Sequence, residues 1–472
     1  MRRAKIVCTL GPAVNTRDAI LRLAQAGMDV ARLNFSHGTF DEHRARMQQV
    51  REVARELRKP IAVLQDLPGP KIRIGEVVEG RVHLRANHPV QVAMSAEPGT
   101  AERLTTDYPH LCDELQVGER ILLCDGLVEL KVLALAPGVV DCRVIKGGAL
   151  TSRKGMNFPS AGQHQPALTE DDRAAIAFGV AEGVDYMALS FVRRAEDLIE
   201  LRALLTAAGA AIPIIAKLEK PQAIANLGSL LAVSDAVMVA RGDLGVEMPP
   251  AEVPILQKHI LKLAQQSSVP AIVATQMLES MTHSPRPTRA EASDVANAVL
   301  DGADAVMLSE ETAVGEYPVE TVEMMAEIIR VAEREPRTGA TPLLREDSLP
   351  QAVCNAASQV AAQLRAKFVC TFTESGGSAR LLSQLRPQTP ILAFTPHRAI
   401  ARQLALFWGV RPLLLPPQQG TDAMIEALDT ELLARKLVQP GDLLVVVCGA
   451  PVSLRGSTNL LKVHRAGAKD LG

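Results

Sequence analysis

The sequence predicts an α/β fold, a (βα)8 TIM barrel that carries an inserted all-β domain and is followed by a separate α/β domain. Apolar strand-like runs alternate with helix-like runs along residues 6–66 and again along residues 169–333, which gives three strands before an interruption and five after it. The interrupting segment is β-rich, and a Pro- and charge-rich linker follows residue 333. Eight βα units suit a closed barrel, although periodicity alone also allows an open doubly wound sheet.

The expected barrel strands are short apolar runs, at residues 6–10, 29–35, 61–66, 186–191, 212–218, 236–241, 271–275 and 305–309. Helical patterns separate them. Helices begin at Thr16 after the first strand, at Thr39 after the second, and at Thr169 before the fourth. This order of elements predicts parallel strands joined by helices.

The inserted segment consists of short runs such as RVHLR, PVQVAM, IRIG and LVELKVLAL, which are separated by Gly, Pro and Asp turns. The last part of the chain has strand-like runs near residues 367–371, 390–394, 411–415 and 443–448. The expected domains are therefore the barrel at 1–68 and 157–337, the inserted β-rich domain at 69–156, and the last α/β domain at 345–472.

Composition narrows the function. The 472 residues carry 51 Lys and Arg against 53 Asp and Glu, and this formal net charge of −2 argues against a nucleic-acid-binding or membrane-surface protein. No apolar run reaches the roughly 18 residues of a membrane-spanning helix, and the apolar stretch at the start is too short for a signal peptide. The seven scattered cysteines show no disulfide or zinc pattern. We expect a cytoplasmic protein that binds small molecules, with no nucleic acid and no membrane partner.

Polar residues follow six of the expected strands, at the carboxyl ends where βα barrels build their active sites. They are Arg32, Asn34 and Ser36, then Asp66, Lys217 and Glu219, Arg241 and Asp243, Thr275, and Glu310 with Glu311. Three pairs are two residues apart, and residues so spaced on a strand share a face. Each pair, Arg32 with Asn34, Lys217 with Glu219, and Arg241 with Asp243, is expected to point toward the barrel axis. A single such pair is usually a solvated ion pair, but six strands together indicate a site.

This set of residue types points to phosphoryl transfer. Two carboxylates with few other ligands suit Mg²⁺ or Mn²⁺, which prefer oxygen and keep positions for substrate phosphates. Clustered Arg and Lys call for a phosphate or carboxylate substrate. Phosphoryl transfer needs positioning and charge neutralisation more than a covalent nucleophile. The sequence holds no P-loop, no GxGxxG and no HExxH motif.

Seven segments carry a family resemblance, in order along residues 3 to about 330: KIVCTLGPA, MDVARLNFSHG, LQDLPGPKIR, IIAKLEKPQAI, VMVARGDLGVE, VATQMLESM and PTRAEASDVANAVLDGADAVMLSEETAVGEYP. They closely resemble the pyruvate kinase family, and the likeness resumes in the last domain. The resemblance implies transfer of the phosphoryl group from phosphoenolpyruvate to ADP, giving pyruvate and ATP, the last step of glycolysis. It also implies that the inserted domain is a lid and the last domain is regulatory.

The resemblance assigns roles on the barrel. Glu219 and Asp243 would hold the divalent ion, and Lys217 would neutralise the phosphoryl group in flight and the developing enolate. The backbone N–H groups of Gly242 and Asp243 would receive the substrate carboxylate. Thr275 would touch that carboxylate near the face where enolpyruvate is protonated, and the proton donor is left open.

The resemblance also assigns the phosphate contacts. Arg32 would hold the phosphate of phosphoenolpyruvate, aided by Asn34 and Arg73. From the lid, Lys154 would reach the nucleotide phosphates, and Asp125 would meet Arg32 when the lid closes. Closure keeps water from the phosphoryl group.

One departure from the family concerns monovalent cations. Many family members use K⁺, held by the equivalents of Asn34, Ser36, Asp66 and the backbone of Leu67, with a Glu where this chain has Lys71. A lysine ammonium group about 4 Å from an anion is worth roughly 4 kcal/mol at an effective dielectric near 20, about what a bound K⁺ would supply. We expect Lys71 to replace the ion and activity to need no K⁺; a solvated lysine at the lid hinge is the alternative.

The last domain contains a strand, a Gly-rich turn and a helix, a plausible phosphate cradle. Its residues are Thr373, Ser375, Gly376, Gly377 and Ser378. They resemble the family's sugar-phosphate effector loop, with Gly377 where a basic residue is often found, and the segment 455–458 would close the same site. By pattern alone an ordinary αβ turn with Gly is favoured. We expect a sugar-phosphate or nucleotide-monophosphate effector, and the family implies a homotetramer.

Two other functions remain as alternatives. A Mg²⁺-dependent barrel lyase acting on a 2-oxo acid would explain the carboxylates and an enolate, but not Lys154 in an inserted lid or Lys71. A non-catalytic phosphometabolite sensor would keep the last domain and lose the chemistry, which the intact Lys217, Glu219 and Asp243 argue against.

Overall fold

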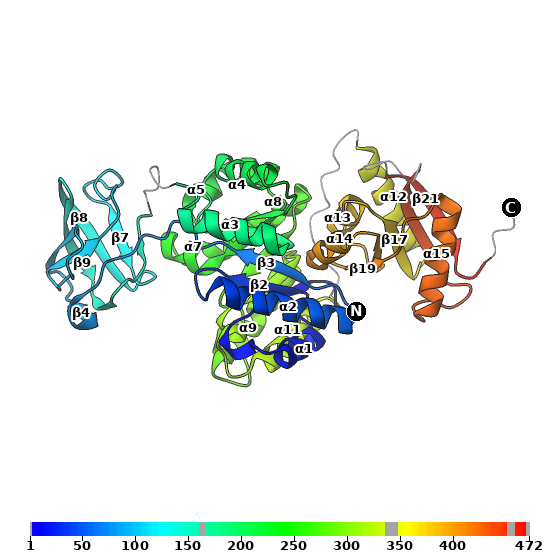
Figure 1. Ribbon diagram of the computed structural model, residues 1–472, viewed down its shortest axis with the longest axis horizontal. Coiled ribbons are helices and arrows are strands. Elements are labelled where there is room, and N and C mark those ends of the chain that lie inside the picture. Colours follow the sequence, from blue (N-terminus) through cyan, green and yellow to red (C-terminus); the bar gives the residue numbers. More distant parts are fainter. Residues whose placement is uncertain (1, 160–165, 336–347, 451–457, 469–472) are drawn as a thin grey trace.

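The computed structural model describes residues 2–159, 166–335, 348–450 and 458–468. Three bodies lie along its long axis: a β-rich domain at one end, a central barrel, and an α/β domain at the other end (Figure 1). The described part of the chain contains no helix that is long and apolar enough to cross a membrane.

The central body is a closed eight-stranded parallel barrel, which confirms the predicted fold class and removes the open-sheet alternative. Its strands are β1 (Lys5–Thr9), β2 (Val30–Asn34), β3 (Ala62–Asp66), β12 (Tyr186–Leu189), β13 (Ile214–Leu218), β14 (Ala236–Ala240), β15 (Ala271–Ala274) and β16 (Ala305–Leu308). The barrel closes where β1 pairs in parallel with both β2 and β16. The strands are buried on both faces, which is why they form near-continuous apolar runs in the sequence.

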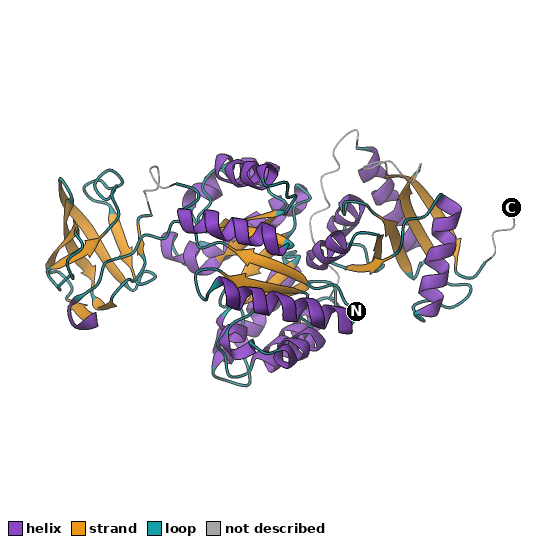
Figure 2. Cartoon of the chain, viewed as in Figure 1, coloured by secondary structure: helices purple, strands orange, loops and turns teal. Residues whose placement is uncertain are grey.

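Helices surround the barrel (Figure 2). They are α1 (Arg17–Ala26), α2 (Phe40–Glu56), α3 (Glu170–Glu182), α4 (Ala195–Ala207), α5 (Pro221–Ala225), α6 (Leu227–Val233), α7 (Arg241–Glu247), α8 (Val253–Gln266), α9 (Arg289–Leu300), α10 (Glu310–Ala313) and α11 (Pro318–Ala332). Thr39, Thr169 and Thr288 each begin a helix with a capping box, in which the threonine and the acidic residue three positions later satisfy each other's backbone N–H groups.

Four aspartates occupy equivalent places at the amino ends of alternate barrel strands: Asp29 before β2, Asp185 before β12, Asp235 before β14 and Asp304 before β16. Each accepts a hydrogen bond of 2.8–3.0 Å from a backbone N–H at the start of a neighbouring strand. Each also pairs with arginine over 2.6–2.8 Å; the arginines are Arg2, Arg51, Arg402, Arg202 and Arg386. These contacts join adjacent strands at the end of the barrel opposite the predicted site.

The last domain packs against this end of the barrel, at the amino ends of the strands. Two of the arginines belong to it, Arg402 on Asp185 and Arg386 on Asp304, and both aspartates are almost fully buried. Leu406 of the same domain is fully buried and packs with the apolar residues of the barrel interior. The last domain therefore plugs the barrel base and binds it through buried charge.

The inserted domain has its own apolar core, built from residues between Ile74 and Phe158. Its strands are β4 (Arg81–Leu84), β5 (Pro89–Met94), β6 (Arg103–Thr106), β7 (Arg120–Leu123), β8 (Val128–Ala136), β9 (Val139–Lys146), β10 (Gly148–Thr151) and β11 (Met156–Asn157). Most runs expected as strands form strands. The IRIG run was wrongly expected as one: it contributes only an isolated bridge between Arg73 and Gly155.

The last domain is a five-stranded sheet in the order β19-β18-β17-β20-β21, with β17 (Phe368–Phe372), β18 (Ile391–Thr395), β19 (Val410–Leu414), β20 (Leu443–Gly449) and β21 (Thr458–Arg465). Its helices are α12 (Leu349–Gln363), α13 (Gly377–Gln384), α14 (Arg398–Gln403) and α15 (Thr421–Ala434). The first four strands match the expected runs. The antiparallel strand β21 was not expected, because it is half-exposed at the sheet edge and lacks a continuous apolar run.

Candidate active site

The Lys217 side chain lies at the carboxyl end of β13 among groups from three other barrel positions. Its Nζ lies 2.9 Å from Glu219 Oε1 and 3.2 Å from Asp66 Oδ1, and it donates a hydrogen bond of 2.7 Å to Ser190 Oγ. Both carboxylate side chains are 1% exposed. Lys217 and Glu219 are therefore in direct contact, although β13 ends at Leu218 and Glu219 follows the strand.

Arg32 on β2 completes the cationic side of this cluster. Its Nε donates to Asp66 Oδ2 over 2.7 Å, and its Nη1 donates to Thr9 Oγ1 over 2.9 Å. Asp66 therefore lies between the guanidinium group of Arg32 and the ammonium group of Lys217. Because β2, β3 and β13 end at the same mouth, charges far apart in the sequence become direct neighbours.

Glu219 is held by the backbone as well as by Lys217. The Phe191 N–H donates a hydrogen bond of 2.7 Å to Glu219 Oε2, and Phe191 has a φ of 55°. Such a positive φ is strained for a bulky residue and often marks a functional site. In this backbone conformation the N–H group of Phe191 points at the Glu219 carboxylate.

Thr275 and Gly242 meet beside this cluster. Thr275 follows β15 with a φ of 71°, unusual for a β-branched residue, and its Oγ1 accepts a hydrogen bond of 2.8 Å from the Gly242 N–H. Gly242 and Asp243 lie in the first turn of α7, where backbone N–H groups have no intrahelical partner. The Asp243 N–H is therefore a donor for an anion, whereas the Gly242 N–H would first have to give up its hydrogen bond to Thr275.

The expectation that Arg241 and Asp243 share a strand face is wrong. Strand β14 ends at Ala240, and both residues lie in α7, where positions two apart point in different directions. Arg241 pairs with Asp294 over 2.7 Å, whereas the charge of Asp243 acts on Lys217 and Glu219. Only Asp243 belongs to the cluster.

Burial and neighbouring charge shift the ionisation of the cluster. Burial raises the pKa of Glu219, Lys217 lowers it in part, and Asp243 raises it further. Burial alone would raise the pKa of Asp66, but Lys217 and Arg32 outweigh it and hold that pKa below its ordinary value. Burial alone would lower the pKa of Lys217, but Asp66 and Glu219 outweigh it and raise that pKa.

The donor set fits a small hard cation. Two cations and three carboxylates leave one negative charge in excess, and buried Glu219 Oε1 has no directed hydrogen bond although it faces Lys217. Mg²⁺ commonly takes one or two carboxylates and completes its shell with water and substrate oxygens. Among the described residues there is no group of three or more His, Cys, Asp or Glu side chains that could hold a metal ion.

The other residues of the expected cation site surround the entry to the inserted domain. Asn34 lies at the end of β2, where its side-chain oxygen accepts a hydrogen bond of 3.2 Å from the Ser36 N–H. The Leu67 carbonyl accepts a hydrogen bond of 2.7 Å from Ser190 Oγ. The Lys71 side chain is exposed and reaches Gly155 of the inserted domain, and within the described residues it forms no ion pair.

Three expected site residues lie on the inserted domain or its base. Arg73 donates to the Arg153 carbonyl over 3.0 Å, and Asp125 and Lys154 are exposed. Burial raises the pKa of the Cys124 thiol, while Lys154 lowers it and Asp125 raises it, so both charges lie close to that residue. Asp125 and Lys154 therefore share one side of the inserted domain. The structure does not bring either of them into contact with Arg32.

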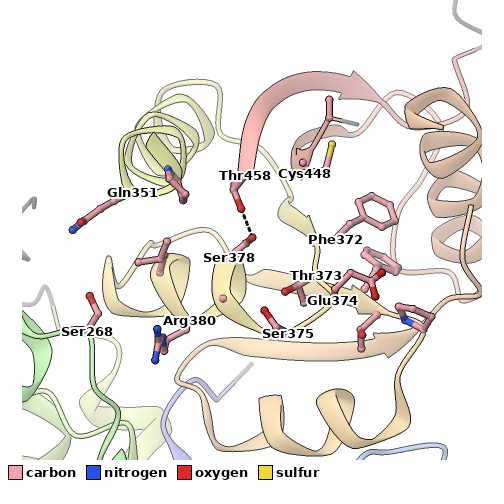
Figure 3. A pocket seen from close by; sticks show the side chains of 18 of the residues that line it. Ser268, Gln351, Phe372, Thr373, Glu374, Ser375, Ser378, Arg380, Cys448 and Thr458 are labelled. Atoms are coloured by element: carbon pink, nitrogen blue, oxygen red, sulfur yellow. Dashed lines mark hydrogen bonds between the residues drawn. The ribbon is translucent and has the colours of Figure 1, made fainter. Parts of the chain in front are cut away.

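Four of the five expected effector residues, Thr373, Ser375, Gly377 and Ser378, line a pocket of about 1300 Å³, which barrel residues such as Ser268 also line (Figure 3). The turn after β17 leads into α13; Gly376 has a φ of 87°, and its N–H donates to Thr373 Oγ1 over 2.8 Å. Ser378 and Thr458 both line the pocket and share a hydrogen bond, with their hydroxyl oxygens 2.6 Å apart. Of the expected closing segment 455–458, only Thr458 falls within the described residues.

Two contacts of the cluster were missed by sequence reasoning. Thr9 anchors Arg32, and Ser190 joins Lys217 to Leu67. Both residues follow the rule that found the others, because Thr9 ends the first barrel strand and Ser190 follows the fourth, the two strands whose ends were not searched. A small hydroxyl residue after a strand is a weak signal beside a charged pair.

Comparisons with known proteins agree with this geometry. The family model described as "Pyruvate kinase, barrel domain" matches residues 1–322, and "Pyruvate kinase, alpha/beta domain" matches residues 351–464. A pyruvate kinase of Mycobacterium tuberculosis is 45% identical over 471 residues, covering 100% of both chains. A pyruvate kinase of Geobacillus stearothermophilus is 44% identical, covering 98% of this chain and 80% of the relative.

A solved structure shows the same arrangement of domains. The crystal structure of a pyruvate kinase from Cryptosporidium parvum superposes with a TM-score of 0.92 at 33% identity, covering 98% of this chain and 96% of that one. Both family models, the full-length identity and the barrel with its charged mouth lead to one conclusion. This chain belongs to the pyruvate kinase family, a family of phosphotransferases.

Proposed function

We propose that this chain transfers the phosphoryl group of phosphoenolpyruvate to ADP at the mouth of its barrel, forming pyruvate and ATP. The observation that carries the proposal is the buried Lys217 ammonium group between Asp66 and Glu219, with Arg32 beside it. Phosphoryl transfer requires fixed positive charge more than a nucleophilic side chain, and this cluster supplies that charge on rigid strands.

Glu219 and Asp243 are the residues that would hold Mg²⁺ or Mn²⁺. Their excess negative charge and the raised pKa of Glu219 support this assignment, since a bound cation would offset the burial and the Asp243 charge that raise that pKa. When bound, such an ion neutralises and orients the oxygens of the substrate.

The residues around the cluster then have separate tasks. Arg32 binds the phosphate and Lys217 stabilises negative charge on the phosphoryl group and on the enolate oxygen, because both cations face the mouth. The N–H groups of Gly242 and Asp243 bind the substrate carboxylate, next to the Thr275 hydroxyl. Thr275 positions the carboxylate near the carbon that takes up a proton.

The inserted domain acts as the lid in this proposal. Lys154 binds nucleotide phosphates, Arg73 assists at the base of the lid, and Asp125 meets Arg32 on closure. Asp125 and Lys154 lie together on one side of the lid, which supports a shared approach to the mouth. Closure would exclude water that otherwise competes with ADP for the phosphoryl group.

Lys71 replaces the monovalent cation in this proposal, so activity needs no K⁺. Two observations support the assignment: its charge has no ion-pair partner among the described residues, and it lies just beyond Gly69, at the entry to the lid. Asn34, Ser36, Asp66 and Leu67 lie at or near the same edge of the mouth.

The pocket of the last domain is the effector site in this proposal. It would take a sugar phosphate or a nucleotide monophosphate, with the phosphate at the start of α13 near Thr373, Ser375, Gly376, Gly377 and Ser378. A volume of about 1300 Å³ is ample for such a ligand. Contacts of this domain with the barrel base would carry the regulatory signal.

The assembly and its location are also proposals. Strand β21 is a sheet edge with a half-exposed face, including Val463 at 42% exposure, and such an edge can pair with a second copy. We propose a homotetramer, which sedimentation equilibrium tests. The seven cysteines are free thiols, which supports a reducing cytoplasm.

The two alternatives lose ground. The comparisons give no support to a barrel lyase acting on a 2-oxo acid, since both family models and the relatives are pyruvate kinases. A non-catalytic sensor would not need the intact cluster of Lys217, Glu219 and Asp243.

The activity itself is tested by pyruvate release. With Mg²⁺ and phosphoenolpyruvate, pyruvate should appear only when ADP is present, and ATP should form in equal amount. Lys217→Met should reduce kcat by about 10³-fold or more, because it removes charge that neutralises the transition state. Lys258→Met, at an exposed ion pair on α8, is the matched control. ADP-independent pyruvate release would favour the lyase.

The pH dependence of kcat should change in Asp66→Asn. Asp66 is the largest of the charges that raise the pKa of Lys217, so its loss lets burial lower that pKa. Lys217 then loses its proton at lower pH, and the alkaline limb of the kcat profile should move down by at least about 1 pH unit. Asp294→Asn, at the ion pair with Arg241, should leave the limb in place. An unmoved limb in Asp66→Asn would contradict the role of Asp66.

The role of Lys71 is tested by rates with and without K⁺. Wild-type protein should turn over equally in Na⁺-free, K⁺-free buffer and in 0.1 M K⁺, with about 0.1 M ionic strength held constant by a bulky organic cation. Lys71→Glu should lower the K⁺-free rate and make activity dependent on K⁺, because the fixed charge is lost. Lys262→Glu, at an exposed position of α8, serves as control. Strong K⁺ activation of the wild type would refute the assignment.

The effector site is tested by binding and kinetics together. A panel of sugar phosphates and nucleotide monophosphates should include one that lowers the KM for phosphoenolpyruvate. Ser378→Ala should weaken its binding about 5- to 10-fold, the cost of one hydrogen bond to a charged group, and leave basal kcat unchanged. Ser229→Ala, at an exposed barrel helix, is the control. Binding by a panel member that Ser378→Ala does not weaken would place the site elsewhere.

A further inference from the structure

The chain passes from the barrel to the lid and back through two buried contacts. On the way out, the Leu67 carbonyl accepts a hydrogen bond from Ser190 Oγ, and Gly69, with a φ of 69°, packs closely against Ser190 and Phe191. On the way back, Asn157 of β11 donates a hydrogen bond of 2.9 Å from Nδ2 to Glu247 Oε1. Both passages therefore touch elements that also form the barrel mouth.

The return contact is a three-residue cluster around Glu247. Lys220 Nζ lies 2.5 Å from the same Glu247 Oε1 that accepts the Asn157 hydrogen bond. Glu247 is 4% exposed, and Lys220 and Asn157 are each 8% exposed. One carboxylate oxygen therefore binds the lid on one side and the barrel on the other.

This cluster is costly for a purely structural contact. Glu247 Oε2 is buried without a hydrogen-bond partner in the described structure, and a buried ion pair often adds no more stability than apolar side chains of the same size. A buried polar contact of this kind restricts the geometry of its partners. The geometry it fixes is that of the lid base against the mouth.

Lys220 and Glu247 are each connected, through the chain or a neighbouring side chain, to one of the two carboxylates proposed to bind the metal. Lys220 follows Glu219 in the chain, and its Nζ lies 5.8 Å from the centre of the Phe191 ring, while the Phe191 N–H binds Glu219. Glu247 ends α7, the helix whose first turn contains Asp243. The lid turn beside Asp125 also approaches this helix, since a Cβ on Gly126 would lie 3.8 Å from Val246.

We propose that Glu247 is a positioning residue that sets the return strand of the lid and the two metal-binding carboxylates in one arrangement. It acts through Asn157 on the lid and through Lys220 and α7 on Glu219 and Asp243. Substrate does not touch it. The inference rests on the proposed function, because the roles of the lid and of those carboxylates come from there.

Two variants separate the two arms of the cluster. Asn157→Ala removes the lid contact and keeps the ion pair of Lys220 with Glu247. Glu247→Gln keeps an oxygen that accepts from Asn157 but leaves the Lys220 ammonium group without its counter-charge. Asn226→Ala is the matched control, because Asn226 also donates a hydrogen bond of 2.9 Å, to the Arg193 carbonyl, outside the cluster around Glu247.

Asn157→Ala should raise the KM for ADP about 5- to 10-fold, since the loss of one buried hydrogen bond loosens the lid that carries Lys154. The KM for phosphoenolpyruvate should stay within about 2-fold, because Arg32, Lys217 and Thr275 lie on the barrel. In this variant, hydrogen exchange at the backbone N–H groups of Met156 and of position 157, measured without substrates, should become faster.

Glu247→Gln should act on the other arm. The unpaired ammonium group next to Glu219 should weaken Mn²⁺ binding to the protein alone about 10-fold or more, measured by calorimetry or electron paramagnetic resonance. The lid contact survives, so hydrogen exchange at β11 should stay close to wild type. Asn157→Ala should leave Mn²⁺ affinity unchanged.

The two arms give distinct failures. Variants that lower the melting temperature but leave the KM for ADP, Mn²⁺ affinity and exchange at β11 unchanged would show that the cluster only holds the fold, and would overturn the inference. An equal rise in the KM values of both substrates in Asn226→Ala would overturn it as well. Wild-type protein that binds Mn²⁺ but releases no pyruvate with ADP would instead overturn the proposed function.

Discussion

The Lys217 ammonium group lies between two buried carboxylates, and the chemistry available at the barrel mouth depends on that contact. Asp66 and Glu219 keep Lys217 charged despite its burial, which alone would favour the neutral amine. In return, Lys217 keeps Asp66 ionised, and Arg32 adds to this effect. Each charge is therefore maintained by the others, so the cluster remains polar inside an apolar barrel without dependence on solvent.

The sequence allowed the barrel, the inserted β domain and most of the mouth to be predicted. The reason is that the carboxyl ends of all strands in a βα barrel lie at the same mouth. Lys217, Glu219, Asp66 and Arg32 were found for this reason. The side-chain direction of Arg241 was wrong because the chain turns into a helix one residue earlier than expected. Ser190 was missed since an uncharged hydroxyl carries little signal until a partner is seen.

The amino ends of the barrel strands carry a repeated aspartate motif that hydrophobic periodicity did not reveal. Four short segments, MDVARL, VDYMAL, SDAVMV and ADAVML, each place an aspartate before an apolar strand, and all four aspartates bind an amide of a neighbouring strand and an arginine. The repeat is only six residues long, and its copies are separated by residues 34–183, 190–233 and 240–302, so each copy looks like an ordinary strand in the sequence. Its meaning depends on arginines from distant parts of the chain.

Two of these arginines, Arg386 and Arg402, come from the last domain and bind opposite strands of the barrel, β16 and β12. An excised barrel would keep the aspartates but lose these counter-ions, and it would expose the apolar surface around Leu406. Asp304 would lose its arginine, Asp185 would keep only Arg51, and the uncovered apolar base would favour association, so the excised barrel would be a poor autonomous folding unit. Truncation after the barrel is therefore expected to yield aggregates. The barrel and the last domain depend on each other to fold.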